Sequence, residues 1–511
     1  MTAFAPGMGR TDKFEGDAVK GTRLAVSLGV CLFVSIGSAS ALTDEEIFRA
    51  FQFNFLNPGA RTLGMGGAAV AGVTDGTAAQ ANPAGLRYVT RPEFFAEFRG
   101  ISRDSEVFGS QLGSLDVDPL SGSRDLPFLG LTSVSNPAST SELNFVSFAW
   151  PLELGAAKRR LVLSASRQVV LTDERVLETS TQNTELRLAF DSFPNTVNGG
   201  QIEAYSISGP VRGQLDTDII YWNLGASFDV HPDFSVGVTV SDASLDLRAA
   251  TLTRIEDPLG LTVDPTHPRL GGQPTTDVFR SNINDSDSDV AFTVGVHWHP
   301  DSVFSSGPSA FRVGAVFRKG VSFDVTETMT LNDAPDGTLE VGVIVPDRYS
   351  VGASYQTKSR WNLAAELERI EYSDLLEGYQ AGVNFLTSGR IVDSLAAIDP
   401  NGTVAYDVDD GNVVRVGAEY VLPLSRSGGQ LSFRGGYFRT PDSRIRMTQF
   451  NSLDPMINDV YLDAFRGGTD EDHYTVGVGF EFKLASIEAA AEFSDSGWQV
   501  VESVVFRLGK K

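Results

Sequence analysis

The sequence is almost free of cysteine. Its 511 residues contain one, Cys31, which lies in an apolar run near the N-terminus. A single cysteine excludes an internal disulfide, and removal of the N-terminal run would leave no thiol at all. The G-x-S-x-G and H-E-x-x-H patterns of serine hydrolases and zinc proteases are also missing. Nothing in the sequence therefore indicates an enzyme.

Positive charge is scarce as well. Lysine and arginine number 41 against 65 aspartates and glutamates, which gives a formal net charge of -24 and a pI near 4.6. Proteins that bind nucleic acid need clustered lysine and arginine to neutralise phosphates. No such cluster is present, so we exclude nucleic acid as a partner.

Long apolar runs are missing after the N-terminus. The longest run, "LAVSLGVCLFVSI" (residues 24–36), follows Lys20 and Arg23 and precedes the small residues "ASA" at 39–41. Basic residues, a short apolar core and small residues in this order predict a signal peptide that is cleaved after Ala41. As a helix, this run is too short to span ~30 Å of hydrocarbon, so a membrane anchor is the weaker interpretation.

Alternation of apolar and polar residues recurs along the rest of the chain. In "YTVGVGFEF" (474–482) every second side chain is apolar or aromatic, and the others are small or polar. "YSVGASY" (349–355) and "WNLAAELER" (361–369) show the same pattern on either side of the short turn "QTKSR". A period of two indicates strands with one apolar face, and two such runs around a short turn predict a hairpin. The 51 glycines and 33 phenylalanines also suit closely packed strands.

About fourteen such strands can be placed, many with the ~9 to 11 residues that a tilted membrane-spanning strand needs. Short turns contrast with long polar segments at 247–288 and 373–411, which we expect to be loops. These features favour an all-β, transmembrane outer-membrane β-barrel over a soluble β-sandwich, whose strands alternate in the same way but are shorter. Aromatic residues at the ends of the apolar faces resemble interfacial girdles; they are Tyr349, Tyr355, Trp361, Tyr474 and Phe482.

A cluster of glycines precedes the first predicted strand. "GMGG" (64–67) leads through small residues to "NPAGL" (82–86). The cluster lacks the G-x-G-x-x-G frame and the lysine of a phosphate-binding loop, so no nucleotide site is expected. Small residues allow backbones to approach closely, and Asn82 before Pro83 favours extended geometry with its amide free to bond backbone groups. The segment suits either a plug packed inside a barrel or a tight turn before an ordinary first strand.

The stretch "GARTLGMGGAAVAGVTDGTAAQANPAGL" (59–86) resembles the N-terminal segment of the FadL/TodX-type (OMPP1) outer-membrane transport proteins for hydrophobic compounds and long-chain fatty acids. The resemblance extends to "IVPDRYSVGASYQTKSRWNLAAELERIEYSDL" (344–375), and to "VRVGAEYVLP", "LSFRGGYF" and "HYTVGVGFEF" nearer the C-terminus. The middle of the chain, about residues 99–288, matches only as generic strands.

The resemblance implies an outer-membrane barrel of about fourteen strands with an N-terminal luminal hatch. With the leader, it divides the chain into a signal peptide (1–41), a hatch (42–90) and a barrel (91–511). It implies a channel in a Gram-negative-type bacterium for passive uptake of hydrophobic compounds, such as long-chain fatty acids or aromatic hydrocarbons. The residues it assigns to gating by the hatch are Asn82, Pro83, Ala84, Gly64, Gly66 and Gly67.

Two further sets of residues are candidates for ligand contact. The segment 373–398 carries apolar residues on a polar background, which suits either an amphipathic capture element or a long loop packed on itself; the candidates are Leu375, Leu376, Tyr379, Phe385 and Leu386. A carboxylate ligand would favour a basic group in the lumen, and Arg415 and Arg434 lie on the predicted luminal face. Expected partners are a hydrophobic small molecule, outer-membrane lipid and the barrel assembly machinery. We expect no cofactor and no metal, and a monomeric barrel.

Two polar clusters have simple interpretations. "DSDSD" (285–289) begins like a calcium loop, but Val290 and Val296 stand where that loop has its glycine and its bidentate glutamate, so a solvated loop is the simpler reading. His297 and His299 could begin a zinc site, yet no third ligand is apparent and the end of a strand explains them.

Two other functions remain open. A barrel of this kind could serve as a secretion adaptor or structural outer-membrane component without transporting anything. A soluble periplasmic β protein would show the same alternation. A continuous apolar path closed by a movable segment at 82–84 would favour transport, and a packed lumen would favour an adaptor.

Overall fold

The computed structural model describes residue 53 and residues 55–117, 124–155, 159–179, 190–194, 201–202, 211–257, 275–300, 310–376, 405–424, 429–449 and 466–509. Among these residues, none of the helices has the length and apolarity needed to cross a membrane.

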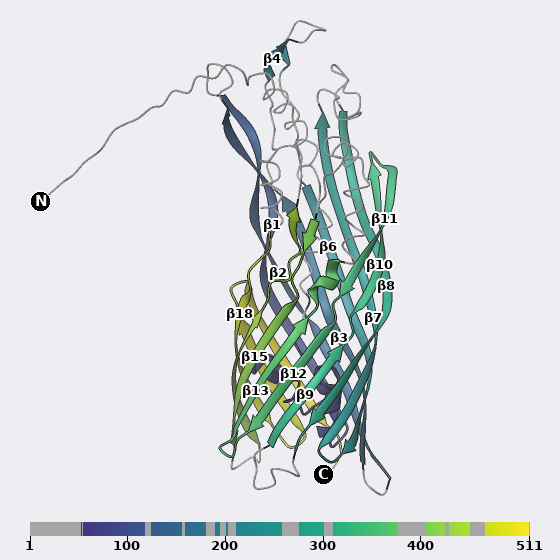
Figure 1. Ribbon diagram of the computed structural model, residues 1–511, viewed down its shortest axis with the longest axis vertical. Helices are drawn as coiled ribbons and strands as arrows, with labels where there is room; N and C mark the ends of the chain where they lie inside the picture. The colour runs from purple at the N-terminus through teal and green to yellow at the C-terminus, as the bar shows by residue number, and fades with distance from the viewer. Residues whose placement is uncertain are drawn as a thin grey trace, which may run out of the picture.

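Fourteen antiparallel strands form a closed barrel (Figure 1). The first strand pairs with the last, and the β8–β9 pairing joins the two ends of the sheet. The prediction of about fourteen antiparallel strands is therefore confirmed. In order around the wall the strands are β8 (Thr275–Trp298), β7 (Phe234–Asp257), β6 (Val211–His231), β3 (Arg159–Thr179), β2 (Arg124–Leu154), β1 (Glu93–Val117), β20 (Gly497–Arg507), β19 (Ala485–Phe493), β18 (Glu471–Glu481), β16 (Gln430–Thr440), β15 (Gly411–Pro423), β13 (Trp361–Ile370), β12 (Arg348–Gln356) and β9 (Ala310–Arg318).

Two more strands belong to the same sheet but are not part of the closed ring of fourteen. Strand β10 (Val321–Leu331) pairs with the upper part of β8 and with β11 (Ala334–Val345). The predicted hairpin around "QTKSR" is present as β12 and β13, which pair from Arg348↔Ile370 to Gln356↔Asn362. Short two-stranded sheets join β14 (Ala405–Asp407) to β17 (Arg446–Gln449) and β4 (Phe190–Pro194) to β5 (Gln201–Ile202).

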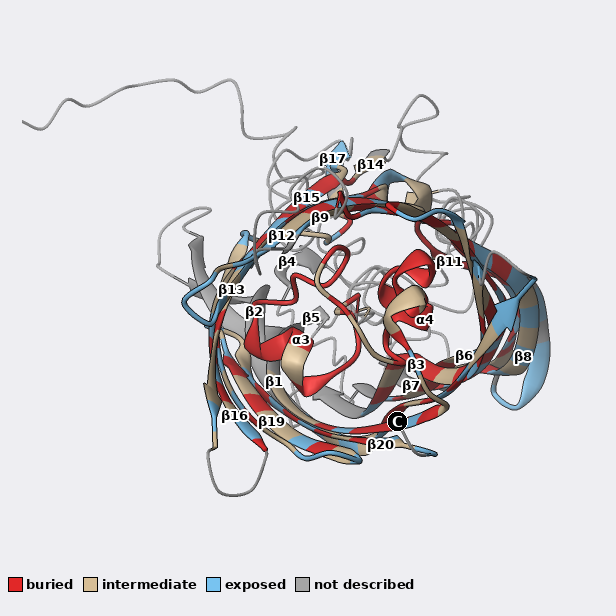
Figure 2. Cartoon of the chain, turned by 90° about the horizontal axis from the view of Figure 1, so that it is seen from below, coloured by how far each residue is buried: buried red, intermediate tan, exposed pale blue. Residues whose placement is uncertain are grey.

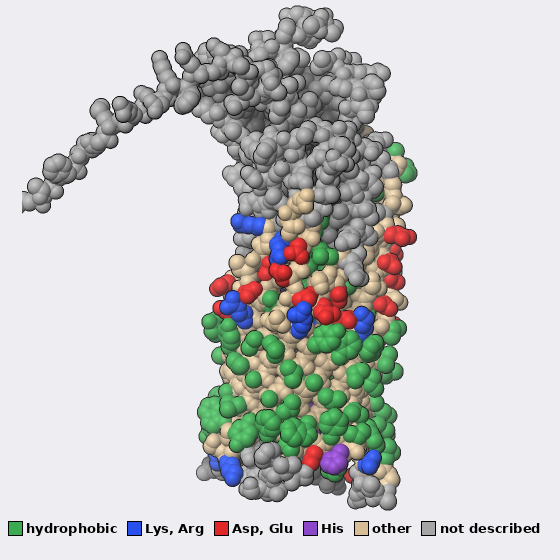
Figure 3. Space-filling view, viewed as in Figure 1, with side chains coloured by type: hydrophobic (Ala, Val, Ile, Leu, Met, Phe, Trp, Pro, Cys, Tyr) green, Lys and Arg blue, Asp and Glu red, His purple; other side chains and the backbone are tan. Residues whose placement is uncertain are grey.

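An apolar band crosses the half of the barrel near the short turns on the face seen in Figure 3. Exposed apolar side chains on all fourteen wall strands continue this band around the barrel. All five tryptophans of the chain face outward in this band, with 43% to 59% of their surface exposed. Aromatic neighbours flank it at both levels, as in Trp361–Tyr420 at 5.0 Å and Phe317–Tyr349 at 4.9 Å between ring centroids. Such a band with aromatic borders is the lipid-facing surface of a transmembrane barrel. The predicted girdle residues Tyr349, Tyr355, Trp361, Tyr474 and Phe482 are all exposed.

The apolar face of the longest strands changes sides above this band. On β7, Val238 and Val240 face outward, whereas Leu245 and Leu247, a few residues further on, are buried inside. The physical reason is the solvent: lipid surrounds the lower half, while water surrounds the upper half, so apolar residues there must turn inward. The change of face marks the level at which the barrel leaves the hydrocarbon.

We expected a loop at residues 247–288, but both ends of this segment are strand. Strand β7 continues to Asp257 and β8 begins at Thr275. We expected a loop because the outward positions become polar there, but the strands continue with the opposite face buried. The "DSDSD" motif is accordingly part of strand β8 and not a solvated loop.

The segment before β1 folds inside the barrel (Figure 2). It contains helix α3 (Ala60–Gly64), helix α4 (Ala78–Ala81) and the 3-10 helix η1 (Pro83–Tyr88). Nearly all of its residues are buried against the inner wall. We refer to residues 55–89 as the plug.

Candidate functional site

Glycines on both sides of the contact let the plug backbone touch the wall. Gly66 and Gly67 have positive φ angles of 65° and 77°, which other residues adopt only with strain. A Cβ on Gly66 would lie 2.5 Å from the Val416 carbonyl oxygen. On the wall, a Cβ on Gly417 or Gly436 would overlap the plug backbone at residues 65–66. The glycine run therefore serves close packing.

The Asn82 side chain uses its amide to join three parts of the molecule. It is fully buried, and its Nδ2 donates to the carbonyls of Val70 at 2.9 Å and Val296 at 3.1 Å. Its Oδ1 accepts the Ala84 N–H at 3.1 Å, which starts η1. The predicted role of this amide in bonding backbone groups matches the geometry, although neither carbonyl partner could be named from the sequence.

The next two residues of the motif continue this attachment to the wall. Pro83 occupies the first turn of η1, where a missing N–H costs nothing. The Ala84 carbonyl accepts hydroxyl hydrogen bonds from Ser227 at 3.2 Å and Ser235 at 3.0 Å on the wall. Asn82, Pro83 and Ala84 thus fix the plug near the short turns of β6 to β9.

Glutamates that point inward from the wall bind N–H groups of the plug. Glu366 accepts the N–H groups of Ala69 at 2.8 Å and Val70 at 2.9 Å through one oxygen. Glu93 accepts the Gly76 N–H at 2.7 Å, and Glu97 accepts that of Gly59. A carboxylate bonded to backbone N–H groups is a strong, charge-assisted anchor. The plug is therefore held from several sides.

Arg415 lies on the luminal face, as predicted, but it is already paired. Its guanidinium contacts Glu366 at 3.2 Å and Glu368 at 2.6 Å. Arg348 and Arg318 also approach Glu368, at 3.5 Å and 3.6 Å. All of these groups are buried or nearly so, and the three guanidinium groups exceed the two carboxylates by one positive charge. Arg415 supports the plug through Glu366 and is not a free site for a carboxylate ligand.

Arg434 is likewise luminal and paired, with Glu419 at 2.8 Å and Glu488 at 2.9 Å. Arg61 of the plug shares Glu419 at 2.9 Å. The Glu419 carboxylate raises the pKa of the Arg61 guanidinium above its ordinary value, so this plug residue stays charged. The two luminal arginines therefore belong to the ion-pair network that seats the plug.

A large apolar cluster fills the barrel above the plug. Its side chains come from β3, β6, β7, β8, β10, β11, β13 and β15, from Phe55 at the start of the plug, and from Tyr372, Val408 and Ile445 outside the strands. We call this set the luminal cluster; it consists of Phe55, Val170, Leu171, Leu215, Ile219, Tyr221, Ala243, Leu245, Leu247, Ala249, Ile283, Ala291, Val321, Phe323, Val325, Val341, Val343, Val345, Ile370, Tyr372, Val408, Val413 and Ile445.

Two of the candidate capture residues reach this cluster. Leu375 and Leu376 are half-buried and pack against its edge, as does Phe53, whose ring stacks on that of Phe55 at 5.3 Å. The other candidates, Tyr379, Phe385 and Leu386, lie outside the described residues. The described end of the predicted capture segment is therefore continuous with the luminal cluster.

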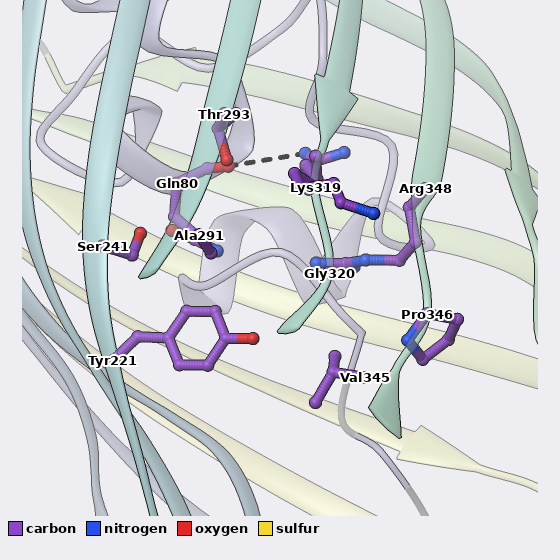
Figure 4. Close-up of a pocket in the computed structure, with 11 residues that line it drawn as sticks. Gln80, Tyr221, Ser241, Ala291, Thr293, Lys319, Gly320, Val345, Pro346 and Arg348 are labelled. Atoms are coloured by element: carbon purple, nitrogen blue, oxygen red, sulfur yellow. Dashed lines mark hydrogen bonds between the residues drawn. The ribbon is translucent and has the colours of Figure 1, made fainter. Parts of the chain in front are cut away.

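A small pocket lies where the luminal cluster meets the plug (Figure 4). Tyr221 and Val345 line its apolar side, while Arg348 and Gln80 of α4 line its polar side. The Gln80 Oε1 is buried and has no hydrogen-bond partner among the described atoms. The pocket brings apolar and polar side chains together, and its space is about that of one water molecule.

Among the described residues, one group of three acids is close enough to hold a metal ion: Asp347, Glu371 and Asp374. Lys319 already approaches Asp347 at 2.9 Å. His297 and His299 pack against Tyr88 inside the barrel, with ring centroids 5.4 Å and 6.0 Å from its ring. This packing gives the two histidines a structural role.

The sequence reading missed the luminal cluster and the glutamates of the wall. The signal for the cluster was present, because apolar residues continue at alternate positions through "SLDLRAA" with the opposite phase to "VGVTV". Alternation placed Glu366 on the face opposite Trp361, but its plug partner Ala69 lies 297 residues away in the chain. Glu93 and Glu97 lie 17 and 38 residues from their plug partners.

The fold and the site define a class: a membrane-spanning β-barrel that holds its own N-terminal segment inside the lumen. No protein-family model and no curated protein matches the chain. Among solved structures, the P. putida toluene transporter TodX is similar, with 14% identity over 90% of this chain and 100% of that chain and a TM-score of 0.50. A Pseudomonas aeruginosa FadL homologue is similar with 12% identity over 89% and 97% and a TM-score of 0.50. The chain therefore has the fold of the FadL/TodX-type proteins, as the resemblance in sequence implied.

Proposed function

We propose that the protein is an outer-membrane channel for passive uptake of hydrophobic compounds, gated by the plug. The luminal cluster is the observation that carries this proposal. A channel for polar solutes has a polar, water-filled interior. Here the inner wall above the plug is apolar over eight strands, which suits molecules that leave water for an apolar surface.

Binding needs no energy source in this scheme. A hydrophobic solute gains about 25 cal/mol for each Å² of apolar surface that it buries. The similarity in fold to a toluene transporter supports aromatic hydrocarbons as one ligand class. Long-chain fatty acids are a second class, which the resemblance in sequence implied. At the edge of the pocket, Gln80 offers a polar group to such a ligand, whereas Arg348 is already paired with Glu368.

The contacts of Phe55 provide a link between ligand and plug. Its ring belongs to the luminal cluster, and its carbonyl accepts a hydrogen bond from Arg348 at 3.3 Å. Arg348 approaches Glu368, which Arg415 also binds. A ligand in the cluster competes with the Phe55 ring for the same apolar surface. Its arrival therefore displaces the beginning of the plug and weakens the network that holds the rest.

Uptake in cells tests the proposal. A strain that lacks the protein is supplied with radiolabelled toluene or radiolabelled oleate, and is complemented with the wild type or with Asn82→Ala. We expect the wild type to restore uptake of at least one probe and Asn82→Ala to change its rate. If neither probe enters faster with the wild type than without it, the transport function is wrong.

An adaptor or structural role is the second candidate, and the packing of the plug favours it. Within the described residues, wall and plug backbones touch beside α3 and at η1. An adaptor predicts that a plug fixed to the wall by a disulfide retains full function. A channel predicts that the same bond stops uptake.

A further inference from the structure

Five charged groups meet inside the barrel, where the plug contacts the wall, and their charges do not balance. Arg318, Arg348 and Arg415 carry three positive charges, whereas Glu366 and Glu368 carry two negative ones. Among the residues that the structure describes, no other carboxylate forms an ion pair with these guanidinium groups. One positive charge is therefore left without a counter-charge.

This surplus charge lies deep in the molecule. The side chains of Arg318 and Arg415 are 4% and 2% exposed, and that of Arg348 is 11% exposed. A buried charge without a counter-charge is costly, because it has lost its hydration and gained no partner. An arginine does not lose its proton in a protein, so it cannot become neutral. We therefore looked for a place beside these groups that an anion could occupy.

The pocket lies beside two of the three guanidinium groups. Arg318 and Arg348 both line it. Arg348 and Tyr221 point toward one another across it (Figure 4). Arg348 donates one N–H to the Phe55 carbonyl, and its carboxylate partner lies 3.5 Å away. A guanidinium has five N–H donors, so others remain for an anion in the pocket.

Neutral hydrogen-bond donors complete the lining of the pocket. Tyr221, Ser241 and Thr293 each carry a hydroxyl group that can donate to an anion. Gln80 of α4 is 5% exposed, and its Oε1 has no partner among the described atoms. A half-turn of this amide places its NH₂ group where the oxygen now lies. Guanidinium, amide and hydroxyl donors thus surround one small space, and such donors bind an anion well.

The size of the pocket limits the anion to a small one. Its space is about that of one water molecule. A halide ion is only slightly larger than water, whereas a carboxylate or a phosphate has several heavy atoms and needs more room. The surplus of one positive charge is balanced by one negative charge. A single monovalent halide ion meets both conditions.

We propose that the pocket binds one chloride ion, which balances the surplus positive charge of the three arginines. The ion accepts hydrogen bonds from Arg318, Arg348 and the neutral donors of the lining. It is a fixed part of the barrel and not a transported molecule. The inference does not depend on the proposed transport function.

The two arginines that line the pocket also hold the plug. Arg318 donates to the Asn57 Oδ1 at 3.1 Å and to the Ala81 carbonyl, and Arg348 donates to the Phe55 carbonyl. A counter-ion between the guanidinium groups reduces their mutual repulsion, so that both can keep their bonds to the plug. An ion that binds only the seated form stabilises that form by mass action. Loss of chloride should therefore loosen the plug.

Hydrogen exchange in different salts tests the site. The purified barrel is kept at one pH and one ionic strength in sodium chloride, sodium bromide or sodium gluconate. Exchange is followed at the amides of residues 80–82, which donate to carbonyls within the plug. We expect exchange to be several-fold slower in chloride and bromide than in gluconate, whose anion is too large for the pocket. Equal exchange in the three salts would overturn the site.

Gln80→Glu supplies the missing negative charge from the protein itself. We expect its plug amides to exchange slowly in all three salts, so that the halide effect disappears. The matched control is Gln356→Glu, which makes the same change of charge at an exposed position of β12 and should keep the halide effect. Arg348→Gln removes the surplus charge and should also abolish the effect. If Gln80→Glu and Arg348→Gln both keep the full halide effect, the ion is not in this pocket.

Crystals grown in sodium bromide locate the ion directly, because bromide scatters X-rays anomalously. We expect one anomalous peak between Arg318 and Arg348 in the wild type and none there in Gln80→Glu. A pocket that holds only water in wild-type crystals would overturn the proposal. Heat-modifiable migration on gels shows whether each variant is folded.

Discussion

At the scale of single residues, the plug depends on a few polar groups that each serve several partners. Asn82 is fully buried and bonds the carbonyls of Val70 and Val296 as well as the Ala84 N–H. Buried polar groups that lose a partner are costly, at about 1 to 3 kcal/mol for each unsatisfied group. A single substitution here should therefore loosen the plug.

Replacement of Asn82 by aspartate should unseat the plug near the short turns. A carboxylate cannot donate, so it would face the two carbonyl oxygens that Asn82 now binds, and we expect a loss of about 2 to 5 kcal/mol in plug attachment. The measurement is hydrogen exchange at residues 70 and 84 in the purified barrel. Asn223→Asp on β6 is the control, because the buried Asn223 amide donates to the Ser166 hydroxyl on the wall. Equal protection of both plug amides in Asn82→Asp and wild type would contradict this role.

Removal of the Glu366 carboxylate should have a larger effect than removal of a surface acid. Glu366→Ala leaves the N–H groups of Ala69 and Val70 without an acceptor and removes a partner of buried Arg415. Loss of one member of a buried ion pair costs about 3 to 5 kcal/mol. We expect protease cleavage within the plug to become faster, with exposed Glu340→Ala of β11 as the control. Cleavage at the control rate would show that this anchor does not hold the plug.

The sequence indicated which way these residues point but not what they bind. Alternation in "WNLAAELER" placed Glu366 and Glu368 on the face opposite Trp361, and the structure buries both acids. The Asn-Pro pair indicated an amide that bonds backbone groups. Their partners depend on how the closed barrel brings distant segments together, as with Asn82 and Val296, which are 214 residues apart. Local periodicity carries no information of that kind.

At the scale of elements, adjacent glycines on one strand have opposite roles. On β16, a Cβ at Gly436 would overlap the plug backbone at Gly66, whereas a Cβ at Gly435 would meet nothing nearer than the Thr475 carbonyl oxygen at 3.9 Å. The strand alternates, so one glycine faces the plug and the other faces away from it.

We therefore expect Gly436→Ala to displace the plug and Gly435→Ala to leave it in place. Overpacking of a tight contact costs about 1 to 3 kcal/mol. Single-channel conductance of small ions through the purified protein in planar bilayers is the measurement, because a displaced plug opens the lumen to water. Equal conductance of the two alanine variants would contradict the close contact between β16 and the plug.

The elements that sequence reading found least well are the upper halves of the long strands. The wall strands of the lipid band were recognised because their apolar residues face outward in short, regular runs such as "VGVTV". Above the band the outward residues become polar, which we interpreted as a loop. The chain continues as strand because the apolar residues of the other face, Leu245 and Leu247, pack inside the barrel. Apolar residues thus still occupy every second position of the strand, but above the band they face the lumen and no longer the outside.

At the scale of the whole molecule, the change of face fixes how deep the barrel sits in the membrane. Below the level at which the apolar face changes sides, outward-facing residues contact lipid and must be apolar. Above it they contact water and can be polar. Val238 and Ser244 lie on the same outward face of β7, below and above this level.

We expect Val238→Lys to destabilise the barrel in lipid vesicles and Ser244→Lys to have little effect. A lysine at the bilayer midplane costs about 2 to 4 kcal/mol and close to the interface about 0 to 1 kcal/mol. Urea-induced unfolding in vesicles, followed by tryptophan fluorescence, measures the difference. Equal unfolding free energies for the two variants would place the membrane border elsewhere on β7.

The contacts of helix α3 also have a consequence for biogenesis. This helix, near the beginning of the chain, packs against β16, β18, β19 and β20, the last long strands to be synthesised. Its binding surface is thus incomplete until the C-terminal strands have been translocated. The wall is too closely fitted for the plug to thread in afterwards, since backbone touches backbone at Gly66 and Gly436. We therefore expect the N-terminal segment to dock only after the C-terminal strands have arrived, before the β1–β20 pairing closes the wall around it.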